Sequence, residues 1–288
     1  MNIGVPKEIK DNECRVSITP YGVMELTKLG NRVFVENNAG IGSGFTNKSY
    51  IKSGASIVDS PQDIFKKCEL IVKVKEPQPS EIKMIKEDQI IFTFFHFAAD
   101  LEMTTNILDS GAISIAYETV QNNDGSLPIL LPMSEVAGRM SIQNGAKCLE
   151  GSMGGMGKLL SGVPGVQSAT VSIIGGGVVG SNAAKLAAGL GAKVNILDID
   201  MPRLRYLDDI MPANVQTLFS NNYNINYILE ETDLLIGAVL VVGSKAPNLI
   251  SKNMLKKMKF GSVIVDVAVD QGGCVETSKP TTHKDPTY

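Results

Sequence analysis

The stretch from Thr170 to Asp198, TVSIIGGGVVGSNAAKLAAGLGAKVNILD, decides the fold of this chain. A β-rich apolar run, Thr170–Ile174, leads into a glycine turn, and a run of small residues at 181–190 is typical of a helix. Gly191 is expected to end that helix, because glycine readily takes the left-handed conformation found there. A second apolar run then ends at Asp198. The order of strand, G-x-G-x-x-G, helix, strand and acid indicates a dinucleotide-binding βαβ unit.

Each glycine of this motif has a distinct expected task. Gly175 permits the tight turn after the strand, and Gly177 lets a pyrophosphate approach the backbone. Gly180 lets the helix pack closely on the sheet. Val178 and Val179 open the helix, whose first N–H groups can bind phosphate. The alternative is a glycine turn with a purely structural role.

Asp198 carries a further expectation about the nucleotide. A carboxylate at the end of the second strand accepts hydrogen bonds from the ribose hydroxyls and repels a 2′-phosphate, which favours NAD. Arg203 and Arg205 follow closely and leave NADP open as the alternative. A solvated acid at a strand end is the other interpretation.

The bulk composition limits the classes of function. A chain of 288 residues is long enough for about two domains. The net charge of −3 gives no reason to expect nucleic acid as a partner. No apolar run approaches the ~20 residues that span a bilayer, and no secretory leader is visible, so we expect a cytoplasmic protein without membrane contact. The cysteines are scattered without C-x-x-C spacing, so no metal site is expected.

Strand-like and helix-like segments alternate along both halves of the chain, which predicts an α/β protein with two doubly wound parallel sheets. We expect a substrate (catalytic) domain at 1–128 and a Rossmann-type NAD-binding domain at 129–288. A run without proline at 134–150 predicts the connecting helix, with Ser134 as its N-cap. Only about five strands can be placed in the second half, so that domain is expected to lack its last strand. The expected strands are Ile3–Val5, Val33–Glu36, Ser56–Val58, Leu70–Val74, Ile90–Phe94, Ile113–Tyr117, Thr170–Ile174, Lys193–Leu197, Val215–Leu218, Asp233–Ile236 and Ser262–Asp266.

Several titratable side chains that could act in catalysis or substrate binding come shortly after expected strands. His96, Lys75 and Asp270 each come just past an apolar run. Ligands bind at the carboxyl ends of parallel strands, so these three are candidates for the site. Each also has an ordinary interpretation: His96 as a packed core residue, Lys75 as a solvated lysine and Asp270 as a turn residue. Arg15 alone is consistent with a surface arginine.

Together these segments closely resemble the alanine dehydrogenases and the related NAD-binding subunit of proton-translocating transhydrogenase. The resemblance covers essentially the whole chain, and its most specific parts are Lys-Glu-Pro, Phe-His-Phe-Ala and Asp-Gln-Gly-Gly. The matching stretches are 4–8, 15–20, 72–77, 92–98, 132–139, 163–166, 175–180, 236–240 and 265–274.

The resemblance implies an enzyme that deaminates L-alanine to pyruvate and ammonium by hydride transfer to NAD, and that catalyses the reverse reaction. It implies a homo-oligomer, a hexamer by analogy. In the substrate site, Arg15 would bind the carboxylate, Lys75 the carboxylate or keto oxygen, and Met133 the methyl group. His96 would be the general acid/base and Asp270 would position the attacking water or ammonia. The residues implied around NAD are Ser134, Gly175, Gly177, Val178, Val179, Gly180, Asp198, Arg203, Ser220, Val239, Leu240, Val267 and Lys279.

The chain departs from the family pattern at two informative places. Phe94 stands where a tyrosine is usual, which removes a hydroxyl beside His96. The family continues beyond Tyr288 with a further strand, loop and helices, so the chain is expected to be C-terminally shortened. The alternatives are therefore a non-catalytic NAD(H)-binding subunit, an inactive truncated paralogue, or a lyase or deaminase that releases ammonia without net redox.

Overall fold

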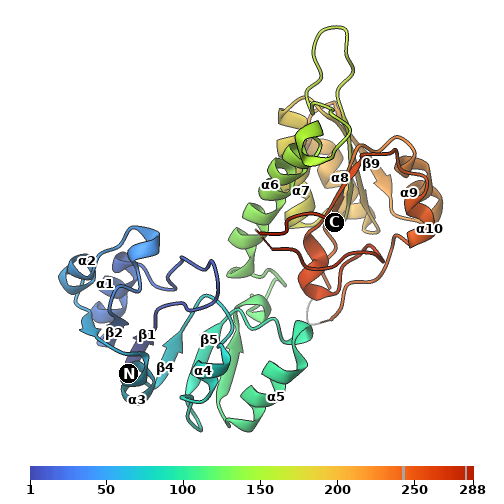
Figure 1. The fold of residues 1–288 in the computed structure, drawn as a ribbon. Helices are drawn as coiled ribbons and strands as arrows, with labels where there is room; N and C mark the ends of the chain where they lie inside the picture. The colour runs from blue at the N-terminus through green and yellow to red at the C-terminus, as the bar shows by residue number, and fades with distance from the viewer. Residues whose placement is uncertain (242–243, 283) are drawn as a thin grey trace. The chain divides into compact units, whose positions relative to one another are not determined.

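The alternating segments form two parallel sheets in the computed structural model, which describes residues 1–241, 244–282 and 284–288 (Figure 1). The chain divides into two units, Met1–Ile129 and Leu130–Tyr288. Each unit is an α/β sandwich with helices on both faces of its sheet, and the second is a Rossmann-type fold. The predicted fold class is thereby confirmed.

The first unit has a six-stranded parallel sheet of order β3-β2-β1-β4-β5-β6. The strand order reverses between β1 and β4, so the connections leave the sheet in opposite directions on either side of that point. The strands are β1 (Asn2–Val5), β2 (Arg32–Glu36), β3 (Ser56–Val58), β4 (Leu70–Val72), β5 (Ile90–Thr93) and β6 (Ile113–Ala116).

Alternate strand residues of this unit enter two cores, as the two-residue period of a strand requires. Val72 packs with Val23 and Tyr50 on one face, whereas Ile71 packs with Phe65 on the other. The helices are α1 (Pro20–Lys28), α2 (Asn47–Lys52), α3 (Pro61–Lys67), α4 (Pro79–Ile82) and α5 (Leu101–Asp109), with 3-10 turns η1 (Ile41–Ser43), η2 (Phe97–Ala99) and η3 (Tyr117–Thr119).

The second unit has a five-stranded parallel sheet of order β11-β10-β7-β8-β9. The βαβ unit quoted above forms its centre. The strands are β7 (Thr170–Ile174), β8 (Lys193–Asp198), β9 (Val215–Phe219), β10 (Leu234–Gly237) and β11 (Val263–Asp266). The helices are α6 (Leu130–Cys148), α7 (Val178–Gly189), α8 (Met201–Ile210), α9 (Asn222–Leu229) and α10 (Lys252–Leu255), with 3-10 turns η4 (Gly151–Met153) and η5 (Val267–Gln271).

Glycines in α6 bring this helix close to its neighbours. A Cβ on Gly138 would stand 2.2 Å from the Val179 carbonyl oxygen of α7, and one on Gly145 would meet Leu234 of β10 at 2.6 Å. The two helices therefore lie side by side over one face of the sheet (Figure 1). Helix α9 covers the opposite face with Ile225 and Leu229.

The predicted start of α6 is wrong. Ser134 is not its N-cap, because the helix begins at Leu130 and Ser134 lies inside it. The prediction began the helix after Pro132, because proline breaks a helix in its interior. Pro132 instead lies in the first turn, where a backbone N–H has no partner within the helix and proline is tolerated.

No helix in the described part of the chain is long and apolar enough to cross a bilayer. Within the same residues, no group of three or more His, Cys, Asp and Glu side chains is placed to hold a metal ion.

Candidate functional site

The glycine turn between β7 and α7 has a conformation in which side chains at Gly175 and Gly180 would clash with the backbone. Gly175 has a φ of +104°, and a Cβ there would stand 2.6 Å from the Ala238 carbonyl oxygen. A Cβ on Gly180 would be 1.8 Å from the carbonyl oxygen of Gly175. Gly177 is the N-cap of α7, and a Cβ on it would meet open space. The turn therefore leaves room at the helix N-terminus, the environment that a pyrophosphate requires.

Asp198 is bonded directly to this turn. Its Oδ2 accepts the Gly176 N–H at 2.6 Å, and its Oδ1 accepts the Asp200 N–H at 2.9 Å. Arg203 Nε donates to the Gly176 carbonyl oxygen at 2.7 Å, and its guanidinium lies over the Tyr206 ring. The glycine turn, the strand-end acid and Arg203 thus form one connected group. A carboxylate oxygen has two lone pairs, so each Asp198 oxygen keeps an acceptor for a ribose hydroxyl, and the arrangement fits NAD.

The other residues implied at the nucleotide belong to the same unit. Ser220, Val239 and Val267 directly or closely follow β9, β10 and β11, at the carboxyl edge of the sheet. The Ser220 N–H donates to the Asp198 carbonyl oxygen at 2.9 Å. The remaining members are Val178 and Val179 in the first turn of α7, Leu240 after β10, Ser134 in α6, and Lys279, whose ammonium lies 4.1 Å from the Tyr288 ring centroid. Met133, implied at the substrate methyl group, also lies in α6.

Asp270 lies exposed in η5, on a loop held by another aspartate. Asp266 Oδ2 accepts from the backbone N–H groups of Cys274 and Val275 at 2.9 and 3.1 Å, and from Ser278 Oγ at 2.6 Å. Its Oδ1 accepts the Ala268 N–H at 3.1 Å. Burial, followed by the Asp266 charge, raises the pKa of the Cys274 thiol to about 12, so this cysteine stays protonated.

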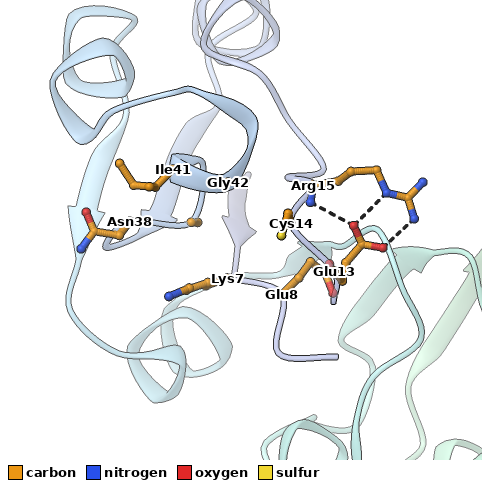
Figure 2. A pocket seen from close by; sticks show the side chains of 9 residues that line it. Lys7, Glu8, Glu13, Cys14, Arg15, Asn38, Ile41 and Gly42 are labelled. Atoms are coloured by element: carbon orange, nitrogen blue, oxygen red, sulfur yellow. Dashed lines mark hydrogen bonds and ion pairs between the residues drawn. The ribbon is translucent and has the colours of Figure 1, made fainter. Parts of the chain in front are cut away.

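Arg15 lies in the loop between β1 and α1, beside a pocket of about 520 Å³ (Figure 2). Glu13 binds its guanidinium in a bidentate manner: Arg15 Nε donates to Glu13 Oε1 at 2.8 Å, and Arg15 Nη2 donates to Glu13 Oε2 at 2.6 Å. The side-chain hydrogen bonds from Arg15, its charge and the charge of Lys75 lower the pKa of Glu13. Lys75 has the smallest of these effects, and its own Nζ lies 3.8 Å from Glu76 Oε2. The pocket is lined by Lys7, Glu8, Glu13, Cys14, Arg15, Asn38, Ala39, Ile41 and Gly42.

Lys75 follows β4, next to a buried ion cluster that the sequence did not reveal. Lys73 is fully buried, and its Nζ contacts Glu8 Oε2 at 3.0 Å and Glu81 Oε1 at 2.8 Å. Glu8 Oε1 also accepts the Val74 N–H at 2.6 Å, and burial raises the pKa of Glu8. These bonds fasten the end of β4 to the loop after β1. The Lys75 carbonyl oxygen in turn accepts from Thr93 Oγ1 at 2.8 Å.

His96 stands at a sharp reversal after β5. Its backbone is left-handed, with φ 53° and ψ 41°. The His96 N–H donates to Glu118 Oε1 at 2.7 Å, and the imidazole stacks on the Phe94 ring at 5.9 Å between centroids. One face of the His96 imidazole is therefore covered by the Phe94 ring, which carries no hydroxyl.

The structure thus places Arg15, Lys75 and His96 in the first unit, and Asp270, Met133 and the predicted nucleotide residues in the second. Sequence reasoning missed Glu13, Glu118 and Asp266, which hold Arg15, His96 and the Asp270 loop. Glu118 was detectable, because it follows an expected strand just as Lys75 and His96 do.

Comparison with known proteins gives consistent results over both units. The family description "Alanine dehydrogenase/PNT, N-terminal domain" matches residues 4–137, and the corresponding C-terminal domain matches residues 141–288. The chain is 55% identical to the alanine dehydrogenase of Methanococcus maripaludis, covering all of this chain and 78% of that protein. It is 54% identical to that of Bacillus subtilis, of which it covers 76%.

Solved structures agree with this result. A structure of L-alanine dehydrogenase superposes with a TM-score of 0.92 at 52% identity, over 100% of this chain and 80% of that one. The transhydrogenase from Sinorhizobium meliloti matches with a TM-score of 0.79 at 25% identity, over 97% and 82% of the two chains.

Proposed function

This chain belongs to the alanine dehydrogenase/PNT family, and we propose that its first unit binds the amino acid while its second binds the nucleotide. The activity is NAD-dependent oxidative deamination of L-alanine to pyruvate and ammonium, with reductive amination as the reverse reaction. The observation that carries it is an identity of 54–55% to alanine dehydrogenases over the whole chain. We propose that the substrate domain covers 1–128 and the nucleotide-binding domain 129–288, a boundary one residue before the division between the two units.

In the second unit, the glycine turn and the α7 N-terminus are proposed to hold the pyrophosphate of NAD, and Asp198 its adenosine ribose. Arg203 is proposed to lie near the adenosine, because it is bonded to the same turn. Ser134, Ser220, Val239, Leu240, Val267 and Lys279 complete this set. Bound NAD would supply the hydride acceptor for the alanine Cα.

In the first unit, Arg15 and Lys75 are proposed to bind the substrate carboxylate and the developing keto oxygen. The position of both cations in the first unit supports this assignment, with Arg15 beside the pocket and Lys75 shortly after the end of β4. Hydride loss from Cα and proton loss from nitrogen leave an imine, to which water adds before ammonium departs. His96 would take the proton from that water, Asp270 would orient it, and Met133 would contact the substrate methyl group.

The non-catalytic NAD(H)-binding subunit is the less supported alternative. The transhydrogenase matches at 25% identity, against 52% for L-alanine dehydrogenase, and with the lower TM-score. We further propose a homo-oligomer, a hexamer by analogy, located in the cytoplasm. Sedimentation velocity of the purified chain tests the oligomer, and a monomer at all concentrations would contradict it.

The deciding experiment follows NADH absorbance with the purified chain, NAD and L-alanine, beside His96→Ala. We expect alanine-dependent NADH formation that falls by about 100-fold or more in the variant, the usual contribution of general acid–base catalysis. Nucleotide binding without NADH formation would support the binding-subunit alternative. Ammonia release without NADH would instead indicate a lyase or deaminase.

A further inference from the structure

The carboxylate of Glu118 occupies a pair of backbone N–H groups beside His96. Glu118 lies in η3, directly after β6, and is half-buried. Its Oε1 accepts the His96 N–H at 2.7 Å, and its Oε2 accepts the Phe95 N–H at 3.3 Å. Two successive N–H groups that point at one anion form a concave anion site, and here the anion is part of the protein.

The backbone at this point needs such support. A residue with a side chain rarely takes the left-handed conformation that His96 has, because its Cβ crowds the following backbone. The two neighbours on the N-terminal side are packed in place: Phe95 is fully buried and Phe94 is 8% exposed. On the other side, the Ala99 N–H donates to the His96 carbonyl oxygen at 2.9 Å.

The strand pairing explains why Glu118 can reach this turn. Strands β5 and β6 run parallel, with Thr93 beside Ala116 at the end of the ladder. Beyond that pair the two segments leave the sheet at the same edge. His96 lies three residues after Thr93, and Glu118 lies two residues after Ala116. The glutamate therefore bridges two neighbouring strand ends that have no further ladder bond to hold them.

From this geometry we infer that Glu118 is a positioning residue for His96. Its carboxylate fastens the left-handed turn and thereby sets where the imidazole stands. The inference rests on the proposed role of His96 as general acid/base. Glu118 acts through the backbone N–H groups of Phe95 and His96.

The test uses Glu118→Gln and Glu118→Asp in the full chain. Glutamine keeps one acceptor oxygen, but its NH₂ group faces a backbone N–H, so one of the two bonds is lost. Aspartate keeps the charge on a shorter side chain and is expected to restore part of the function. We expect kcat to fall about tenfold or more in Glu118→Gln with KM for L-alanine within about threefold, because an acid/base group is displaced and the substrate cations are not.

A second measurement reports on His96 without turnover. Diethyl pyrocarbonate acylates neutral imidazole, and mass spectrometry separates the His96 peptide from that of His283. The acylation rate of His96 against pH, and the pH profile of kcat, are expected to change together in Glu118→Gln and to move back toward wild type in Glu118→Asp. Glu102→Gln, an exposed carboxylate at the start of α5, is the matched control and should change neither.

The outcomes separate this inference from the proposed function. Full activity in His96→Ala would remove the acid/base role of the histidine, whatever Glu118 does. Loss of activity in His96→Ala with wild-type kcat and acylation in Glu118→Gln would overturn the positioning role alone. If Glu118→Gln does not fold, Glu118→Asp decides, and a wild-type kcat and pH profile there would overturn the inference. If neither variant folds, Glu118 is a determinant of the fold and the inference also fails.

Discussion

Asp198 combines two tasks at the scale of single residues. Its carboxylate closes the glycine turn through the Gly176 N–H and lies where the ribose of NAD is proposed to bind. The same negative charge opposes a 2′-phosphate, while Arg203 beside it would attract one. If Asp198 binds the ribose as proposed, cofactor choice is expected to depend on the balance between this acid and the neighbouring Arg203.

Asp198→Ala is expected to reduce kcat/KM for NAD by about ten- to a hundredfold, since charge-assisted hydrogen bonds contribute ~1.5–3 kcal/mol. The ratio of NADP to NAD activity should rise, because the repulsion is removed and Arg203 remains. Initial rates with each nucleotide at saturating L-alanine measure both quantities.

Asp209→Ala serves as the control, because Asp209 is an exposed residue of α8. It should leave both nucleotides unaffected. An unchanged preference for NAD in Asp198→Ala would show that Asp198 does not select the nucleotide.

At the scale of elements, the contact between β7 and α7 depends on a missing side chain. A Cβ on Gly180 would overlap the Gly175 carbonyl oxygen at 1.8 Å, so Gly180→Ala must push the helix away from the strand. We expect the free energy of unfolding to fall by about 3 kcal/mol, the upper part of the range for overpacked cores. Urea unfolding followed by circular dichroism measures it.

Gly189→Ala in the same helix is the matched control. A Cβ there meets nothing within 4 Å, and Gly189 lies exposed in α7. Alanine should raise the unfolding free energy by roughly 0.5–1 kcal/mol, because it loses less backbone entropy than glycine on folding. Equal effects of the two substitutions would refute the close-packing argument.

Elements with a strong local pattern could be predicted from the sequence, and those without one could not. The run Thr170–Ile174 was predicted with the observed bounds, because a fully buried parallel strand is continuously apolar. The start of α6 was misplaced, because proline ends a helix in its interior but is tolerated in its first turn.

At the scale of the whole molecule, stability in acid is expected to depend on Asp233. This aspartate is 1% exposed and accepts hydrogen bonds from Lys158 Nζ at 2.6 Å, Lys259 Nζ at 2.9 Å and the Thr170 N–H at 2.8 Å. Burial alone would raise its pKa, but these bonds outweigh burial and hold the pKa below its usual value of 3.8. The buried Asp233 charge thus connects Lys158, Thr170 and Lys259, which lie 75, 63 and 26 residues away in the sequence.

A lowered carboxyl pKa stabilises the folded chain above the unfolded-state pKa of about 3.9, and this contribution is lost as the pH falls through the lower folded-state value. Asp233→Asn should therefore lower Tm at neutral pH. The difference from wild type should shrink below about pH 4, where the wild-type carboxylate becomes protonated. Thermal melts across this pH range measure the effect.

Glu231→Gln provides the control, because the Glu231–Lys193 pair is exposed on both sides and should contribute little. A Tm difference between wild type and Asp233→Asn that does not depend on pH would contradict the assignment.

The sequence predicted which site residues follow strands, but not what holds them. Lys75 and His96 could be placed because parallel strands deliver their carboxyl ends to one edge. The residues that hold these two segments come from distant parts of the chain. Glu8, which binds Lys73 just before Lys75, is 65 residues from Lys73, and Glu118 is 22 residues from His96. Such partners leave no periodic pattern, so only the folded chain brings them together.

The attachment of the 267–278 loop to Asp266 has an evolutionary consequence. Five donors converge on this one carboxylate, counting Cys274 Sγ at 3.6 Å, whereas Asp270 lies exposed in the same loop. The bonds to Asp266 that hold the loop therefore do not involve the side chain of Asp270, which is proposed to act on the substrate. A lineage can exchange that residue without rebuilding the backbone around it, so new chemistry can arise on an inherited scaffold.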